Sequence, residues 1–250
     1  MSNGGDHSIM TSPDSIGLAA PNYPPAPKPA VKESIHWLAL GAIAGPLLFT
    51  VAWLVLGFVS PGFTIWGVLI APYSPISAGI SGLGLGITAP YLNAAFVLLG
   101  LLLLAGVAGI YQALDDVKPA GRWAIALLLG LSALGAALDG IFTLQSLFPH
   151  LIGFVLATGS PVVSFLVTGL LLRRSARWGP LAEWLLFASP LTLALFVLYF
   201  VTFSPTAEGA TTGIAGLTER ILVTEVFVWF VALGWTAFRS RTAGEVNARA

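Results

Sequence analysis

Long apolar runs alternate with short polar segments along most of the chain. A helix needs about 20 mostly apolar residues to cross the hydrocarbon layer of a bilayer, and six runs reach that length. Charged residues and prolines separate them, for example at residues 115–119 and 173–175. The pattern predicts an all-α, polytopic bundle of six membrane-spanning helices. The predicted spans are residues 35–59, 90–114, 123–144, 150–172, 181–203 and 221–238.

Three segments outside these runs have a different character. Residues 1–34 are rich in Pro, Gly and Ser, which predicts a disordered tail of extended, polyproline-like backbone, and Met1 is not followed by the basic and apolar stretches of a secretory signal. Residues 60–89 contain no charged residue and predict a loop that lies on, or dips into, the membrane interface. The alternative is a lid that simply caps the bundle. Residues 239–250 carry three arginines and predict a basic tail.

The composition supports a membrane protein. The chain is 56% hydrophobic and 9% charged, with a mean hydropathy of +0.89, whereas a soluble domain carries about 25% charged residues. This composition excludes an ordinary globular domain and a disordered chain. With zero net charge and no long basic patch, it also excludes a nucleic-acid binder. Because the chain has no cysteine, it has no disulfides, thiolate metal ligands or cysteine nucleophiles.

The basic residues predict the orientation, since Lys and Arg accumulate in cytoplasmic segments. If the N-terminus lies in the cytoplasm, ten of the eleven basic residues fall on the cytoplasmic side and only Arg220 falls outside. These ten are Lys28, Lys32, Lys118, Arg122, Arg173, Arg174, Arg177, Arg239, Arg241 and Arg249. Both termini are therefore predicted to be cytoplasmic, with residues 60–89 outside.

Several polar side chains are predicted to reach a common depth near the outer face. An ionisable group at the bilayer centre costs about 2.5–3.5 kcal/mol, so each one requires a partner or a cavity. At a rise of about 1.5 Å per residue, Asp139 lies about 24 Å along the third helix and Glu225 about 7–8 Å into the sixth. The candidate binding residues are Asn93, Asp139, His150, Glu219, Arg220 and Glu225, covered by the loop residues Tyr73, Ser74, Ser77 and Ser81.

This cluster has two interpretations. It is either a pocket for a membrane lipid or small amphiphile, with Arg220 pairing an anionic head group and Asp139 holding or relaying a proton, or an internal salt-bridge network. In the network, Arg220 neutralises Asp139 or Glu225 and orders the bundle. A zinc site usually needs three or four ligands, and His150 is the one histidine on this side. We therefore predict no metal and no cofactor.

Two other functions stay open. Ser77 or Ser81 with His150 and Asp139 supplies the residue types of a Ser-His-Asp lipid hydrolase, although no nucleophile-elbow motif surrounds either serine. The chain is alternatively a non-catalytic accessory subunit of a larger membrane complex, or a homo-oligomer, in which the polar cluster is structural.

The segments at 79–84 (GISGLG) and 213–218 (GIAGLT) are similar to each other. Each follows a span in which a proline lies 15 residues before a Ser-Pro pair, Pro46 before Pro61 and Pro190 before Pro205. This similarity predicts a parallel internal repeat, as found in some transporters. The alternative is chance likeness between two apolar sequences.

A family resemblance rests on the same positions. Residues 73–86 (YSPISAGISGLGLG), Asn93, Asp139-Gly140, Pro149-His150 and residues 216–220 resemble the prokaryotic integral membrane family called domain of unknown function 998. The resemblance covers about residues 35–238. It implies a bundle of six to seven helices in a prokaryotic cytoplasmic (inner) membrane, and it implies no biochemical activity.

Overall fold

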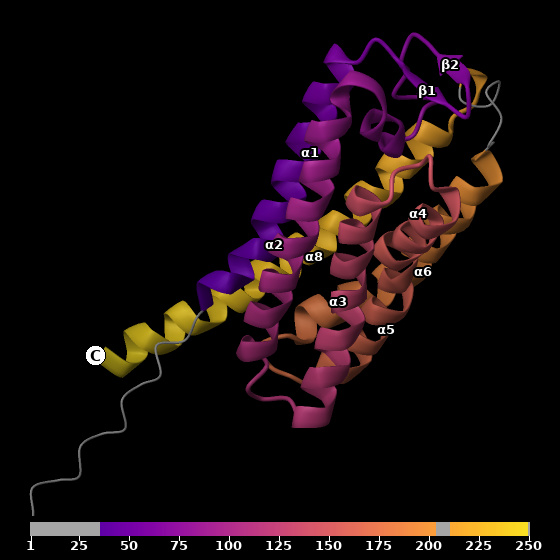
Figure 1. The fold of residues 1–250 in the computed structure, drawn as a ribbon. Coiled ribbons are helices and arrows are strands. Elements are labelled where there is room, and N and C mark those ends of the chain that lie inside the picture. The colour runs from indigo at the N-terminus through magenta and orange to yellow at the C-terminus, as the bar shows by residue number, and fades with distance from the viewer. Residues whose placement is uncertain (1–35, 204–210, 250) are drawn as a thin grey trace, which may run out of the picture. The chain divides into compact units, whose positions relative to one another are not determined.

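The computed structural model describes residues 36–203 and 211–249, with side chains described as far as residue 239. Within these ranges, six helical segments are long and apolar enough to cross a membrane (Figure 1). They are Trp37–Val59, Gly86–Ala113, Pro119–Ile141, Leu147–Leu172, Gly179–Thr202 and Ala215–Arg239. The predicted six-span, all-α membrane bundle is confirmed. The tail predicted at residues 1–34 lies outside the described residues.

Regular helices form most of these spans. A short 3-10 helix, His36–Leu40, leads into α1 (Gly41–Val59), and α2, α3, α6 and α8 cover Ala89–Ala113, Pro119–Ile141, Gly179–Thr202 and Ala215–Arg249. The fourth span is composite: α4 (Leu147–Phe154), a π-helical turn at Val155–Gly159, and α5 (Ser160–Leu172). Helices α2, α3 and α6 each have a proline in the first turn, where its missing N–H leaves no helical hydrogen bond unmade.

The uncharged segment after α1 folds into a small cap at one end of the bundle. Strands β1 (Phe63–Ile65) and β2 (Val68–Ile70) form an antiparallel hairpin in which Phe63 pairs with Ile70. Two 3-10 turns, η2 (Ile80–Gly84) and η3 (Gly86–Thr88), then lead into α2. The side chain of Gln145, between α3 and α4, donates to the Thr64 carbonyl at 3.2 Å and holds the hairpin down. We call this the hairpin end of the bundle (Figure 1).

Small residues let the first two spans approach closely. A Cβ atom on Gly106 or Gly109 of α2 would collide with the backbone at Ala42 or Ala39, which fits the small-residue spacing of packed membrane helices. Helix α8 packs against α1, α2 and α6 (Figure 1). Large apolar side chains such as Phe58 point outward and stay exposed, as expected for a surface that faces lipid.

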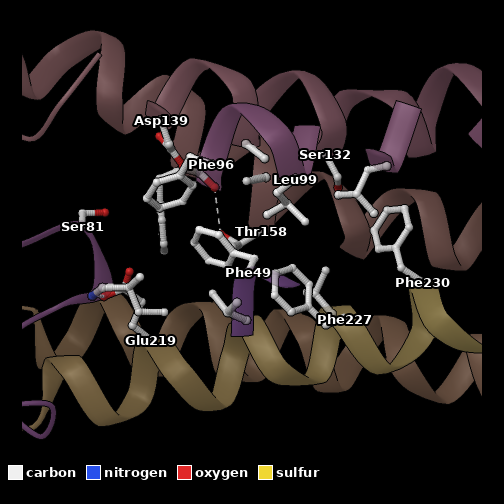
Figure 2. Close-up of a pocket in the computed structure, with 17 residues that line it drawn as sticks. Phe49, Ser81, Phe96, Leu99, Ser132, Asp139, Thr158, Glu219, Phe227 and Phe230 are labelled. Carbon is white, nitrogen blue, oxygen red and sulfur yellow. Dashed lines mark hydrogen bonds between the residues drawn. The ribbon is translucent and has the colours of Figure 1, made fainter. Parts of the chain in front are cut away.

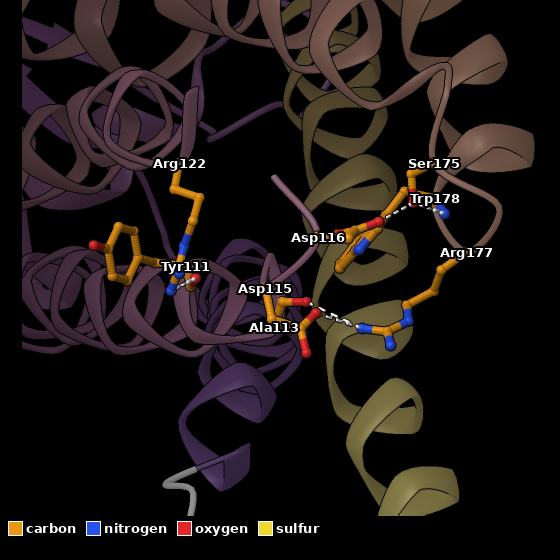
Figure 3. A network of polar contacts seen from close by, with 8 residues as sticks. All are labelled: Tyr111, Ala113, Asp115, Asp116, Arg122, Ser175, Arg177 and Trp178. Atoms are coloured by element: carbon orange, nitrogen blue, oxygen red, sulfur yellow. Dashed lines mark hydrogen bonds and ion pairs between the residues drawn. The ribbon is translucent and has the colours of Figure 1, made fainter. Parts of the chain in front are cut away.

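The opposite end of the bundle carries exposed charges, and we call it the basic end. It contains the segments around Lys118 and Arg173, which join α2 to α3 and α5 to α6. Arg177 donates to Asp115 at 3.0 Å, Ser175 donates to Asp116, and Arg122 donates to the Tyr111 carbonyl at 3.0 Å (Figure 3). Polar contacts thus join two loops at the surface.

The last span differs from its predicted bounds. The span begins at Ala215 instead of 221 and ends at Arg239, one residue beyond the predicted end, while helix α8 itself continues to Arg249. Its early start is stabilised from within, because Thr218 Oγ1 donates to the Ala215 carbonyl at 3.0 Å and Arg220 Nη1 donates to the Gly216 carbonyl at 2.7 Å. Glu219 and Arg220, predicted at the mouth of the helix, are therefore buried in its first turns. The other spans lie within four residues of their predicted bounds.

Candidate functional site

A serine, a histidine and an aspartate from three elements meet beneath the hairpin end. Nε2 of His150, on α4, lies 2.8 Å from Ser81 Oγ in the η2 turn. The other ring nitrogen, Nδ1, lies 2.8 Å from the Phe142 carbonyl oxygen and 3.4 Å from Asp139 Oδ1, on α3. His150 and Asp139 are 5% and 3% exposed. These three side chains were all predicted site residues, and the structure brings them together.

The Phe142 contact fixes where the proton of a neutral His150 lies. A carbonyl oxygen only accepts hydrogen bonds, so Nδ1 must carry the proton and donate it to Phe142. In the neutral imidazole, Nε2 then has a free lone pair and accepts the hydroxyl proton of Ser81. The imidazole is therefore held as a base facing the serine.

The ends of two helices create this arrangement. Helix α3 ends at Ile141, so the next carbonyl, at Phe142, lies beyond the helix and is available to His150. Helix α4 begins only at Leu147, which places His150 in its first turn, facing back toward α3. One turn further along α4, a Cβ atom on Gly153 would overlap the Asp139 carboxylate, so the glycine leaves room for the buried acid.

Glu219 ties α8 to the turn that carries the serine. Its Oε2 accepts the backbone N–H of Ile80 at 3.0 Å, and the side chain is 3% exposed. A backbone hydrogen bond from Leu217 to the Ile76 carbonyl, 2.9 Å long, joins the same two segments. The start of α8 is thus joined to residues 76–80, beside the two similar segments at 79–84 and 213–218. Whether those segments descend from a repeat stays a prediction.

Arg220 binds the loop at residues 73–78 through several hydrogen bonds. Its Nη1 donates to the carbonyls of Pro75 (2.8 Å), Ala78 (3.1 Å) and Gly216 (2.7 Å), and its Nη2 donates to the Tyr73 hydroxyl. The guanidinium also stacks on the Trp53 ring, 5.2 Å from its centroid. Among the described residues, no ion pair joins Arg220 to Asp139 or Glu225, so the salt-bridge network of the second interpretation is not present in that form.

Burial changes the acidity of the tyrosine in this contact. Tyr73 lies in the loop outside the spans and is 8% exposed. Burial raises its pKa to about 12, because the phenolate loses its hydration, and the nearby Arg220 charge opposes this only in part. The hydroxyl therefore stays protonated at physiological pH, and it accepts the hydrogen bond from Arg220 as a neutral phenol.

A cavity of about 430 Å³ lies under the hairpin, within the range of ligand-binding pockets. Its polar lining consists of Ser77, Ser81, His150 and Glu219. The rest of the wall is mostly apolar and comes from the hairpin, α4 and α6, including Phe63, Trp66, Leu147, Leu151, Phe154, Tyr199, Phe200 and Phe203. The buried Oγ of Ser77 has no hydrogen-bond partner among the described residues.

A second, smaller cavity lies next to the first and shares lining residues with it. Its volume is about 30 Å³, enough for roughly two water molecules. Figure 2 shows Ser81, Asp139 and Glu219 toward one end of it, and Phe227 and Phe230 toward the other. Ser81, Phe154 and Glu219 line both cavities. The Oδ1 atom of Asp139 is buried without a hydrogen-bond partner among the described residues.

The other predicted site residues line neither cavity. Glu225 accepts from Trp229 Nε1 at 2.6 Å and from Thr192 Oγ1 at 2.9 Å, which joins α8 to α6. Asn93 donates to the Gly84 carbonyl at 3.2 Å, and Ser74 Oγ accepts from the backbone N–H of Ile76 at 3.3 Å. These residues, with Tyr73 and Arg220, hold the surrounding segments in place.

The apolar wall and the π-helical turn were not predicted from the sequence. Aromatic residues from Phe196 to Phe203 were visible only as part of an apolar run, and the packing of α6 against the hairpin-end cavity could not be read from that run. The π-helical turn directly precedes Pro161, whose position in the span was the one available indication. Such turns are frequent at functional sites.

Within the described ranges, no three His, Cys, Asp or Glu side chains gather in an arrangement that could hold a metal ion. Asp139, Glu219 and His150 are instead spread along two neighbouring cavities. What the site offers chemically is a hydroxyl hydrogen-bonded to an imidazole, next to an apolar space.

Comparison with known proteins identifies the family. The family model described as "Protein of unknown function (DUF998)" matches residues 43–236. The chain therefore belongs to this family, as the resemblance of residues 73–86 and the other motifs predicted. No curated protein and no solved structure matches the chain. The family description assigns no activity, so the function must be argued from the site.

Proposed function

We propose that this multi-pass membrane protein binds a single-chain amphiphile in the cavity under the hairpin, with its acyl chain against the aromatic wall. The observation that carries the proposal is that the cavity wall has a large apolar part and a small polar part. A space of about 430 Å³ has an extended apolar wall and four polar side chains, of which the Ser77 hydroxyl has no partner among the described residues. Ligand sites commonly combine an apolar lining with a few placed polar groups.

The polar lining favours an uncharged head group. Arg220, which the sequence offered as the partner of an anionic head, lines neither cavity and already donates to three carbonyls and a phenol. Glu219, an acid, does line the cavity and supplies no positive charge to pair with an anion. A hydroxyl or ester head, as in a monoacylglycerol, meets the serine hydroxyls and His150 without burying a second charge.

The same proposal includes a location. The basic end contains Lys118, Arg122, Arg173, Arg174 and Arg177, and basic segments favour the cytoplasmic side. We therefore infer a prokaryotic cytoplasmic membrane in which both termini lie inside and the hairpin end faces outward. The ligand then enters from the outer leaflet. A protein partner, an accessory-subunit role and a homo-oligomer stay predictions.

Two neighbouring residues on α4 provide a matched test. Leu151 lines the cavity, whereas Ile152 lines neither cavity, and their exposed fractions are similar at 39% and 43%. In purified protein in phosphatidylcholine nanodiscs, Leu151→Trp should fill the cavity and weaken binding of a fluorescent monoacylglycerol at least about tenfold. Ile152→Trp should leave the affinity unchanged. Equal affinities in both variants and the wild type would show that the ligand does not occupy this cavity.

A further inference from the structure

We propose that Ser81 is a nucleophile that accepts an acyl group from an ester held in the cavity, with His150 as its general base. This inference rests on the proposed function, because the cavity must first bind the ester. It adds to that function a reaction, acyl transfer to serine followed by hydrolysis, and a substrate class, neutral acyl esters.

The first support is the contact between the two groups. A nucleophile and its base lie within about 2.6–3.2 Å of each other in covalent catalysis, and Ser81 Oγ lies 2.8 Å from His150 Nε2. The Phe142 carbonyl holds the proton on Nδ1, which leaves Nε2 able to accept. No rearrangement of the ring is needed before proton transfer.

Asp139 acts through His150 and is a positioning residue. Its Oδ1 lies 3.4 Å from His150 Nδ1 and has no hydrogen-bond partner among the described residues. A carboxylate at that place favours the imidazolium that forms when His150 takes a proton, as the acid of a Ser-His-Asp triad does. An acid that is 3% exposed and whose Oδ1 lacks a hydrogen-bond partner among the described residues has no evident benefit for stability alone.

The two cavities provide space for the ester and for the water molecule, and their lining includes a possible donor to the ester carbonyl oxygen. Ser81 lines the large cavity, where the ester binds, and also the small one, which has room for roughly two water molecules. The unpartnered Ser77 hydroxyl lines the large cavity and is available to donate to the carbonyl oxygen as that oxygen becomes negative. Glu219 accepts the N–H of Ile80 and so fixes the turn in which Ser81 lies.

The reaction has two balanced steps. In the first, Ser81 Oγ attacks the ester carbonyl carbon while its proton passes to His150 Nε2. The carbon–oxygen bond to the alcohol then breaks, and the alcohol leaves with the proton from His150. In the second, a water molecule gives a proton to His150 and attacks the acyl–serine. Ser81 Oγ regains a proton from His150, and the carboxylic acid leaves.

Labelling with an alkyl fluorophosphonate tests the nucleophile. In nanodiscs, the wild type should gain the phosphonyl mass on the peptide that contains Ser81. Ser81→Ala should abolish the labelling, and His150→Ala should slow it at least about 100-fold. Ser146→Ala, an exposed serine on the loop before α4 that lines neither cavity, is the control and should label like the wild type. Labelling that is absent in the wild type, or equally fast in His150→Ala, would overturn the proposal.

A cysteine variant covers the case in which Ser81→Ala fails to fold. Because the natural chain contains no cysteine, Ser81→Cys creates a single thiol. Iodoacetamide should modify Ser81→Cys faster when His150 is present than in the Ser81→Cys/His150→Ala double variant. Equal rates would contradict a base at this position. Asp139→Asn should keep the affinity for the fluorescent monoacylglycerol and slow the labelling about tenfold, whereas a purely structural role would change both or neither.

The two proposals can fail separately. If the Leu151→Trp and Ile152→Trp pair shows binding in the cavity but Ser81 is never labelled, the binding function stands and the nucleophile is disproved. If a short ethyl fluorophosphonate labels Ser81 while Leu151→Trp leaves amphiphile binding unchanged, the reactive serine is real but the proposed binding site is not, so the assignment of acyl esters as substrates falls with it.

Discussion

The two ends of the bundle use charged residues in opposite ways. At the basic end, Arg177 and Asp115 form an ion pair 3.0 Å long whose side chains are 40% and 59% exposed. At the hairpin end, Asp139, Glu219 and Arg220 are 3%, 3% and 8% exposed. Arg220 contacts carbonyls and a phenol there instead of a carboxylate. The basic end has an exposed ion pair, whereas the hairpin end has buried ionisable side chains among which Arg220 forms no ion pair with Asp139.

The difference shows where polar groups serve more than solubility and loop contacts. Exposed ion pairs contribute about 0–1 kcal/mol and cost little to keep. A buried charge is expensive unless hydrogen bonds replace its hydration. Arg220 and Glu219 have such bonds, but Asp139 Oδ1 has none among the described residues. The positioning role that we propose for Asp139 beside His150 would explain why the hairpin end retains this acid.

The largest expected difference between the two ends is the loss of stability when one arginine at each end is replaced. Arg220→Met should lower the free energy of unfolding by about 3–5 kcal/mol, because the carbonyls of Pro75, Ala78 and Gly216 lose their donor. Arg177→Met should cost about 1 kcal/mol or less. Unfolding by SDS in mixed micelles, followed by circular dichroism, gives both values. Similar losses in the two variants would mean that burial does not distinguish the ends.

A pH dependence confined to the hairpin end is the next largest effect. The pKa of Tyr73 is about 12 in the folded protein, compared with 10.0 for a free phenol. The neutral phenol is thus favoured by folding, so its contribution is complete below pH 10 and is lost as the pH rises toward 12. Between pH 9 and pH 12, the wild type should lose about 2–3 kcal/mol more stability than Tyr73→Phe.

The same unfolding assay measures this difference. Tyr91→Phe is the control for loss of a phenol, because Tyr91 is 68% exposed on α2. The explanation by burial would be refuted by parallel pH profiles for Tyr73→Phe and the wild type.

The smallest effect compares one polar side chain at each end. Asn93→Leu removes the donor to the Gly84 carbonyl at the hairpin end. At the basic end, Ser175→Ala removes both the donor to Asp116 and the acceptor of the Trp178 backbone N–H. Each should cost about 1 kcal/mol of stability. Only Asn93→Leu should also weaken monoacylglycerol binding, by a few fold, because Gly84 ends the turn that contains Ser81. Equal binding in the two variants would show that this turn does not contribute to ligand binding.

The sequence placed several of the residues that meet beneath the hairpin at a common depth, for a limited reason. Depth along a helix follows from counting residues, so Asp139 and His150 could be assigned to one level, and Ser81 to the segment above them. Rotation about the helix axis could not be assigned. Glu219 and Glu225 lie six residues apart on α8, about 240° around the helix at 100° per residue. One therefore lines the cavities, and the other binds Thr192 and Trp229.

The number of spans and the grouping of basic residues at one end were determined by the sequence alone, because hydrophobic burial in a membrane depends on the composition of each 20-residue run. The fold of residues 60–88, the early start of α8 and the contact of Ser81 with His150, 69 positions later, were decided by the tertiary structure. These contacts depend on how helices are rotated and where their ends expose backbone groups. Neither property is encoded in the composition of a single run.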